Sequence, residues 1–175
     1  MNSQSKHILV IGVAGSGKSS IVESLKAQRI VAIDGDYDKH IAYWEHKKTS
    51  KRINDVFSIE GKAVDYHEWL WDLKTMKNFL EKSPNRVIVC GQANNRTDAY
   101  NLFGKIIVLT ADDKTLIKRL INRTNNPFGK LASHRKQILL DNKNLLKEAK
   151  NKGFKIINTS NLDVEEVVNA ILNSN

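Results

Sequence analysis

Two patterns of apolar residues alternate along the chain. Short apolar runs rich in β-branched residues, typical of buried parallel strands, lie at about residues 7–12, 30–33, 86–90, 105–109 and 154–158. Between them, apolar residues recur at helical spacing at about residues 18–28, 65–80, 114–122, 131–151 and 164–171. Five strands alternating with helices predict one α/β domain over residues 1–175, with a parallel sheet and right-handed crossovers. Ser160-Asn161-Leu162-Asp163 predicts a capping box before the last helix.

The segment between the second and third strands is less regular and holds all three tryptophans, Trp44, Trp69 and Trp71. A stripe of apolar residues with a 3.6-residue period predicts a helix at about 65–80 that packs into the core. Its members are Tyr66, Trp69, Leu70, Leu73, Met76 and Leu80. We assign residues 37–84 as a substrate-binding insertion.

The composition describes an ordinary globular protein of 175 residues, 41% of them hydrophobic. No apolar run approaches the ~20 residues of a membrane span, and residues 1–6 lack the apolar core of an export signal. Cys90 is the only cysteine, which excludes an internal disulfide and a Cys-based metal cluster. We therefore predict a cytoplasmic protein without a membrane partner, in which Cys90 is a small buried apolar residue.

The net charge of +9 is unevenly distributed along the chain. Residues 114–155 carry 12 Lys and Arg against 2 Asp and Glu, so this segment holds +10 and the rest of the chain about −1. A basic segment of this kind suits a polyphosphate ligand or nucleic acid. It is also typical of a helix surface that simply faces water.

A phosphate-binding pattern, G-x-x-x-x-G-K-S, follows the first strand and opens the first helix. Its glycines let the backbone turn tightly, and successive N–H groups then form an anion-binding nest at a helix N-terminus. Lys18 adds positive charge for the β- and γ-phosphates, and the Ser19 hydroxyl can ligate Mg²⁺. We assign nucleotide binding to Gly12, Val13, Ala14, Gly15, Ser16, Gly17, Lys18, Ser19 and Ser20.

Carboxylates follow the second strand, in Asp34-Gly35-Asp36-Tyr37-Asp38. Ligands of open α/β sheets bind beyond the carboxyl ends of the strands, so we expect Asp34 and Asp36 to point toward the phosphate loop. An ordinary turn made by two Asx residues is the structural alternative.

Together these residues resemble the shikimate/gluconate kinase and nucleoside monophosphate kinase group of P-loop phosphotransferases. The resemblance covers nearly the whole chain as an order of elements, and the phosphate loop is its strongest motif. It includes Asp34-Gly35-Asp36, Gly91 after the third strand, the pair Arg119 and Arg123, and Asn158-Thr159-Ser160. It implies a five-stranded parallel sheet in the order 2-3-1-4-5 with helices on both faces, and a kinase that uses ATP and Mg²⁺.

The resemblance also implies an acceptor and metal site. Asp34 would hold a water of the Mg²⁺ shell, and Asp36 would accept the proton of a substrate hydroxyl or orient it. Cys90-Gly91-Gln92 stands where the group often has an acid or a glycine-rich run, so the metal site depends on Ser19 and Asp34 alone. The expected substrate-binding residues are Asp36, Trp44, His67, Gly91 and Gln92.

On the nucleotide side, the resemblance implies that Arg119 stacks on the adenine. Thr159 and Ser160 would contact the adenine edge through their backbone. Arg123 would reach over the phosphates from a short lid at about 123–134, because phosphoryl transfer requires positive charge on developing negative oxygens. The expected catalytic residues are Lys18, Asp36 and Arg123.

Three functions are compatible with these residues. The first is ATP-dependent transfer to a small-molecule hydroxyl, favoured by Asp34 and Asp36 and by the short lid. The second is a nucleoside or nucleotide kinase, favoured by the 52 residues from 35 to 86, where a tryptophan could stack on a base. The third is an ATP-dependent nucleic-acid-binding or regulatory module that uses residues 114–155. The sequence identifies neither the acceptor nor the oligomeric state.

Overall fold

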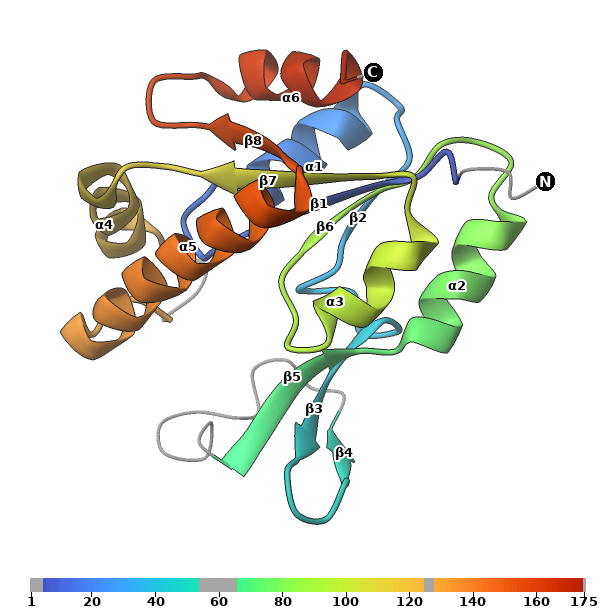
Figure 1. Cartoon of the computed structure of the whole chain (residues 1–175), viewed down its shortest axis with the longest axis horizontal. Coiled ribbons are helices and arrows are strands. Elements are labelled where there is room, and N and C mark those ends of the chain that lie inside the picture. Colours follow the sequence, from blue (N-terminus) through green and yellow to red (C-terminus); the bar gives the residue numbers. More distant parts are fainter. Residues whose placement is uncertain (1–4, 54–65, 125–127, 175) are drawn as a thin grey trace. The chain divides into compact units, whose positions relative to one another are not determined.

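The computed structural model describes residues 5–53, 66–124 and 128–174 (Figure 1). Its main sheet has five strands in the order β2-β6-β1-β7-β8. They are β1 (Ile8–Gly12), β2 (Ala32–Asp34), β6 (Ile88–Gly91), β7 (Lys105–Thr110) and β8 (Lys155–Asn158). Counted among themselves in chain order, these strands run 2-3-1-4-5. The predicted α/β fold class is therefore confirmed.

The paired strands at the two edges of this sheet are parallel. β2 pairs with β6 from Ala32 opposite Ile88 to Asp34 opposite Cys90. β7 pairs with β8 from Ile107 opposite Lys155 to Thr110 opposite Asn158. β1 is buried along its whole length, as expected of a strand whose apolar run lacks polar alternation.

A second sheet of three short antiparallel strands was not predicted. It has the order β4-β3-β5 and consists of β3 (Ala42–His46), β4 (Arg52–Ile53) and β5 (His67–Trp71) (Figure 1). β3 pairs with β5 over five residues, from Ala42 opposite Trp71 to His46 opposite His67. The segment assigned as a substrate-binding insertion therefore contains strands.

The predicted helix at 65–80 is wrong in its first half. β5 occupies His67–Trp71, and α2 (Leu73–Lys82) begins only after Asp72. The Asp72 carboxylate accepts a hydrogen bond from Thr75 N at 3.0 Å, which caps the helix N-terminus at that residue. Met76 and Leu80 are buried as predicted, whereas Tyr66 is 59% exposed. Pairing with β3 determines the conformation of His67–Trp71, and the helical period there is a coincidence of spacing.

The chain divides into two compact units. The first comprises Met1–Leu9 and Val31–Lys105 and includes the three-stranded sheet, α2, α3 (Arg96–Ala99) and the 3-10 helix η2 (Tyr100–Leu102). The second comprises Val10–Ile30 and Ile106–Asn175 and includes α1 (Lys18–Ala27), α4 (Asp113–Asn122), α5 (Ala132–Lys152) and α6 (Val164–Leu172). The insertion at 37–84 and the lid at 123–134 stay predictions.

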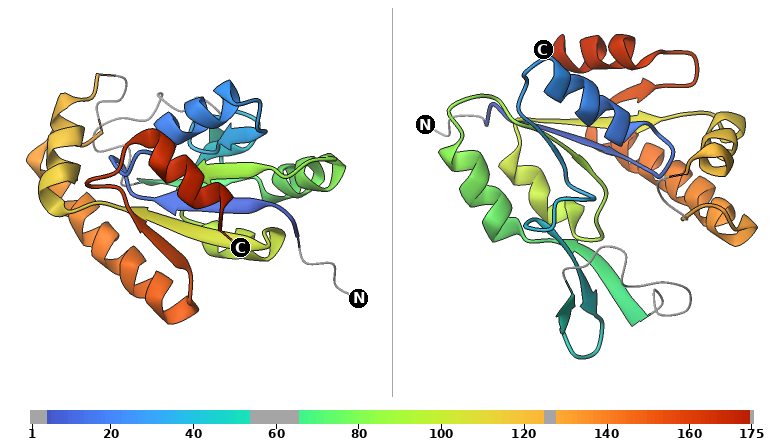
Figure 2. Two further views of the ribbon diagram at one scale, coloured as in Figure 1. Left: turned by 90° about the horizontal axis from the view of Figure 1, so that it is seen from above. Right: turned by 180° about the vertical axis from the view of Figure 1, so that it is seen from behind.

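In the second unit, α1 and α6 lie side by side (Figure 2). Ser24 Oγ donates to Glu165 Oε1 at 2.8 Å, and Gln28 Nε2 donates to Glu165 Oε2 at 3.0 Å. The predicted capping box at Ser160 is wrong, because the box that forms joins Asp163 and Glu166 reciprocally. The glutamate at the third helical position decides which residue becomes the N-cap.

Two further findings concern Cys90 and the length of the helices. Cys90 is buried within β6 as predicted. Across the part of the chain that the structure describes, the helices are too short or too polar to cross a bilayer.

His7 is a buried histidine in the first unit, 7% exposed, whose Nδ1 accepts a hydrogen bond from Val87 N at 3.0 Å. Burial, with Lys6 nearby, lowers its pKa from 6.5. The unfolded chain therefore binds this proton more readily, so the stability that neutral His7 contributes is present above about pH 6.5 and lost as the pH falls below it. We expect the free energy of unfolding to decrease from about pH 7.5 to about pH 5.5, measured by urea unfolding.

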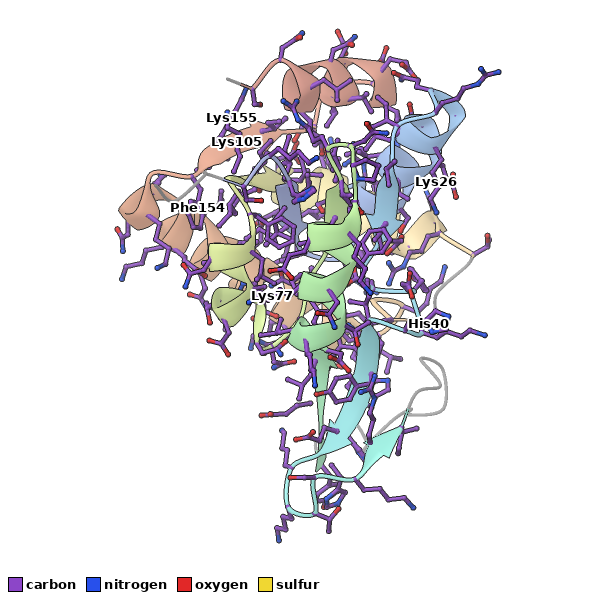
Figure 3. The ribbon with its side chains drawn as sticks, turned by 90° about the vertical axis from the view of Figure 1, so that its right-hand side faces the viewer. Lys26, His40, Lys77, Lys105, Phe154 and Lys155 are labelled. Carbon is purple, nitrogen blue, oxygen red and sulfur yellow. The ribbon has the colours of Figure 1, made fainter. Side chains whose placement is uncertain are left out.

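In the variant His7→Gln, the free energy of unfolding should decrease less over the same pH interval, because the variant lacks the titrating group. His40 is exposed in the loop after β2 (Figure 3), so His40→Gln is the control and should retain the wild-type pH dependence. An unchanged decrease in His7→Gln would show that other groups cause it.

Candidate functional site

The phosphate loop between β1 and α1 has the backbone that its glycines predict. Gly15 and Gly17 have positive φ angles of 87° and 103°, a region that L side chains rarely adopt. Gly17 precedes the first residue of α1, and among the described residues no side chain caps this helix end. Because the first intrahelical bond runs from Ile21 N to Gly17 O, the N–H groups of residues 18–20 are those that an anion can bind.

Gly12 and Ser16 show how tightly this loop is closed. A methyl group on Gly12 would lie 2.5 Å from Ser16 Oγ and 2.7 Å from the Leu109 carbonyl oxygen. Ser16 is fully buried, and its Oγ has no hydrogen-bond partner within the described ranges. A buried hydroxyl of this kind requires explanation, because most buried polar groups are paired. A phosphate oxygen at the loop would provide the missing partner.

Lys18 lies inside the loop rather than on the helix surface. Only 8% of it is exposed, and its Nζ donates to Gly12 O at 2.7 Å and to Val13 O at 3.4 Å. The ammonium group is therefore fixed beside the backbone that binds phosphate. Ser19 is half-buried and Ser20 is exposed at the next two positions.

Apolar packing holds the loop from the other side. Val13 forms a cluster with Ala111, Leu116, Leu120 and Ile138, and Ala14 packs against it. Gly15 also lies on α4, since a Cβ there would be 3.3 Å from Leu120 Cγ. The loop is consequently anchored by α4 and α5, two helices that follow it by about a hundred residues.

Arg119 and Thr159 form a polar junction next to the loop. The Arg119 guanidinium donates to Gly15 O at 3.3 Å, to Thr159 Oγ1 at 2.8 Å and to Thr159 O at 2.8 Å. The Thr159 hydroxyl is also within hydrogen-bond distance of Ser16 O at 3.2 Å and Thr110 O at 3.1 Å. The structure thus brings together residues of the phosphate loop, α4 and the segment after β8, all within the second unit.

Ser160 links the segments that follow β7 and β8. Its Oγ accepts from Asp112 N at 2.8 Å and donates to Asn158 Oδ1 at 2.7 Å. Hydrogen bonds to its carboxylate, first from Thr115 N and also from the Thr115 hydroxyl, lower the pKa of Asp112 to about 2. Asp112 therefore stays ionised as the N-cap of α4, the helix that carries Arg119.

Arg123 occupies the C-cap of α4, and its guanidinium donates to the Phe128 carbonyl. The same segment is held by Arg135, which donates to Gly129 O at 3.1 Å and to Lys130 O. The Phe128 and His134 rings stack with centroids 4.9 Å apart. Residues at the two ends of the predicted lid are therefore linked by hydrogen bonds and ring contacts. Residues 125–127 of the lid lie outside the described range.

For the ATP-dependent activity that the resemblance implies, we expect Arg119→Lys to raise the KM for ATP about tenfold, which is about 1.4 kcal/mol. Lysine keeps the charge but loses the planar fork that bonds Gly15 and Thr159 together. Steady-state kinetics with varied ATP measure the change. Lys118→Ala removes an exposed cation one position earlier and is the control. A KM in Arg119→Lys that matches the Lys118→Ala value would contradict a nucleotide-side role for Arg119.

In the first unit, the aspartates after β2 form a tight turn. Asp34 Oδ1 accepts from Asp36 N at 3.1 Å, as an Asx turn does. Asp36 Oδ1 accepts from Gln92 N at 2.6 Å, which fixes the direction of that carboxylate. Gln92 Oε1 is buried and has no hydrogen-bond partner among the residues described. Asp36, Gly91 and Gln92, three of the residues predicted to bind the acceptor, therefore lie together.

Trp71 supports this turn from β5. Its indole Nε1 donates to Gly35 O at 2.9 Å, and Gly35 N donates to Cys90 O at 2.7 Å. A Cβ on Gly91 would lie 2.8 Å from Trp71 Cζ2 and 3.2 Å from Asp36 Oδ1. The residue at position 91 must therefore be glycine for Trp71 and Asp36 to keep these positions.

Sequence reasoning missed Asn94 and Asn95, which join the loop after β6 to β5. Asn95 Oδ1 accepts from Trp71 N and its Nδ2 donates to Trp71 O, each at 2.9 Å. Asn94 N donates to Trp69 O at 2.8 Å, and Asn94 Oδ1 accepts from Trp69 N at 3.2 Å. A carboxamide can imitate a backbone ladder in this way because it has both a donor and an acceptor.

Trp44 and His67 lie on the three-stranded sheet. The Trp44 and Trp69 rings are 5.0 Å apart, and so are the His46 and His67 rings. The side chains of Trp44 and His67 are both half-buried. Across the described ranges, no group of three or more His, Cys, Asp or Glu side chains is arranged to hold a metal ion.

We expect Gly91→Ala to reduce the free energy of unfolding by about 1–3 kcal/mol, because the added methyl group overlaps the Trp71 ring. Urea unfolding measures the loss. Gly153→Ala is the control: its φ is 68°, but no atom of the described residues lies within 4 Å of the added Cβ, so only backbone strain applies. In a Trp71→Leu background the cost of Gly91→Ala should shrink, and an equal cost there would show that the indole contact is not its cause.

Known proteins resemble this chain over nearly its whole length. The shikimate kinase of Pelotomaculum thermopropionicum is 26% identical over 172 residues, which cover 95% of this chain and 94% of that protein. A shikimate kinase from Acinetobacter baumannii in complex with shikimate has a TM-score of 0.58 at 18% identity, covering 95% of this chain and 90% of that one. A gluconokinase from Sinorhizobium meliloti has a TM-score of 0.54 at 18% identity, covering 95% and 89%.

The similarity of this chain to these two solved structures shows its fold, which is that of small P-loop kinases. The family described as AAA domain matches residues 8–140 of this chain. That range contains the phosphate loop, the aspartate turn and Arg119, and it spans most of the sequence. The chain therefore belongs to the AAA domain family of P-loop proteins.

Proposed function

We propose that this protein is a kinase that moves the γ-phosphate of Mg·ATP to a hydroxyl group of a small molecule. The phosphate loop carries the proposal, because Lys18 is buried in it and no described side chain caps the N-terminus of α1. Such an arrangement suits a polyphosphate. Relatives named as shikimate kinase and gluconokinase support it. Both names describe transfer to hydroxyl-bearing acids, and the acceptor of this chain is a separate question.

The residues present fit ATP and Mg²⁺. The buried Ser16 hydroxyl and the positive-φ glycines form a cradle that a side chain at Gly12 would fill. Ser19 and Asp34 offer the hydroxyl and carboxylate oxygens that Mg²⁺ prefers. When bound, Mg·ATP supplies the phosphoryl group, and the metal neutralises part of its charge.

On the nucleotide side, Lys18 would stabilise negative charge on the transferred group from its fixed position. Arg119 and Thr159 would support the loop and border the adenine. Arg123 would bring positive charge from the lid. These roles require positioning and charge rather than covalent chemistry, as phosphoryl transfer does.

On the acceptor side, Asp36 would orient the hydroxyl and accept its proton. Its carboxylate is held by Gln92 N, so the side chain would need no reorganisation before transfer. Gln92 Oε1 would accept a hydrogen bond from a second polar group of the acceptor. A cytoplasmic location, where ATP is supplied, is part of the proposal.

An acceptor screen tests the proposed function. The full chain is incubated with ATP, Mg²⁺ and a panel of sugar acids, polyols, shikimate and nucleosides, and ADP release is measured by a coupled assay. We expect one class to raise ADP release at least about tenfold above hydrolysis without acceptor, since a bound hydroxyl replaces water. ADP release that no acceptor raises, from a protein that binds ATP, would contradict a small-molecule kinase.

A further inference from the structure

One face of the three-stranded sheet is lined by aromatic side chains. Successive residues of a strand point to opposite faces, so His67, Trp69 and Trp71 share one face of β5. Their partners on β3 are His46, Trp44 and Ala42. The ring contacts agree, because the Trp44 and Trp69 planes meet at 56° and the His46 and His67 planes at 87°. We call His46, Trp44, Trp69, Trp71 and His67 the aromatic face.

The opposite face of the same sheet, which we call the polar face, carries the charged residues of the three strands together with Tyr43 and Leu70. Arg52 lies over the Tyr43 ring at 3.9 Å and pairs with Asp72 at 2.9 Å. Glu45 pairs in register with Glu68 on one side and with Arg52 on the other. The guanidinium of Arg52 therefore belongs to the polar face. The sheet separates a side with charged residues from a side of rings, of which Trp71 is buried and the other four are half-buried.

The aromatic face is continuous with the proposed acceptor site. Trp71, at one end of it, donates to Gly35 O and lies against Gly91, which adjoins Asp36. From Trp71 to His67 the strand advances four residues, about 13 Å at 3.3 Å per residue. If the hydroxyl of an acceptor reaches Asp36, the remainder of the acceptor molecule would therefore lie beside the rings of the aromatic face.

We infer that the acceptor is a nucleoside, whose base stacks on the Trp44 and Trp69 rings and whose sugar hydroxyl reaches Asp36. This inference rests on the proposed function. Every nucleobase has a π-face that an indole can stack on, whatever its hydrogen-bonding edge. The polar atoms at the end of the face are hydrogen-bond acceptors: Asp36 Oδ1 accepts from Gln92 N, and Gln92 Oε1 has no partner among the described residues. Acceptors suit the hydroxyl groups of a ribose.

The charge of the aspartate turn favours a neutral acceptor at this position. Asp34, Asp36 and Asp38 lie in one turn, and they would repel the carboxylate or phosphate of an acceptor that has no cation between it and them. Among the described residues of β3, β4 and β5, the one cationic guanidinium, Arg52, bonds on the polar face. A neutral sugar hydroxyl fits these groups better than a sugar acid or a nucleoside monophosphate does.

Tryptophan fluorescence reports on this face directly, because all three tryptophans of the chain belong to it. We expect adenosine, cytidine, guanosine or uridine to quench the emission saturably, and the same nucleoside to raise ADP release at saturating Mg·ATP. Trp44→Leu should raise the KM for that nucleoside at least about tenfold, with a smaller change in kcat, while Trp44→Phe retains most of the stacking. Tyr43→Leu, on the polar face, is the control and should keep the wild-type KM.

The outcomes separate this inference from the proposed function. ADP release with shikimate or a sugar acid but with no nucleoside would overturn the inference and leave the kinase intact. Nucleoside turnover with equal KM values in Trp44→Leu and Tyr43→Leu would overturn the stacking. ADP release that no acceptor raises would overturn the proposed function itself, and nucleosides that neither quench nor react would overturn the inference independently.

Discussion

Lys18→Ala is expected to lower kcat/KM for phosphoryl transfer about 10³-fold, a loss of about 4 kcal/mol in transition-state stabilisation. Lys18 Nζ is held beside the phosphate loop by Gly12 O at 2.7 Å, and only 8% of the residue is exposed. A cation fixed in a buried site interacts with phosphate more strongly than one in water does. Alanine removes this charge without replacing it.

The fold should tolerate the change. Lys18 is a helix residue that alanine can replace without loss of helix propensity, and the hydrogen bonds to Gly12 O and Val13 O contribute about 1 kcal/mol each. The thermal midpoint of Lys18→Ala is therefore expected within several degrees of wild type by circular dichroism. Lys26→Ala is the matched control, since Lys26 is an exposed lysine in the last turn of the same helix (Figure 3). Equal activity in the two variants would contradict the role of Lys18.

The nucleotide half could be predicted from sequence because its main parts are adjacent in the chain. Gly15 and Gly17 meet a local steric need for positive φ, which appears in the sequence as glycine. The apolar run before the loop is a strand buried along its length, and its pattern is equally local. What could not be predicted is the bonding of Arg119 to Thr159, a contact between residues 40 positions apart.

The proposed acceptor half depends on contacts between residues that are distant in sequence. His67–Trp71 has the spacing of a helix, but pairing with β3 makes it a strand, and no local signal reveals that partner. Asp72 and Thr75 did carry a signal, since an aspartate before an apolar stripe is a helix N-cap. Asn94 and Asn95 look like loop residues, and only the position of the β5 backbone gives them a role.

Asp36→Asn is expected to lower kcat about 10²- to 10³-fold, the range of a lost general base. The amide has nearly the same shape as the carboxylate. Its oxygen can still accept a hydrogen bond from Gln92 N, which in the wild type lies 2.6 Å from Asp36 Oδ1. The turn should therefore persist, and ATP binding to the phosphate loop should be unchanged. What the variant loses is a group that can take the proton of the acceptor hydroxyl.

Three measurements distinguish loss of the base from loss of the turn. The first is the KM for ATP, which should stay near wild type. The second is the free energy of unfolding, which should change by less than about 1 kcal/mol for an exchange that preserves the hydrogen bond. The third is the control Asp38→Asn: the Asp38 side chain accepts from His40 N at 2.9 Å in the same loop, and the variant should retain kcat. If Asp36→Asn and Asp38→Asn lowered kcat equally, Asp36 would have no role of its own, and the loop would act only through its conformation.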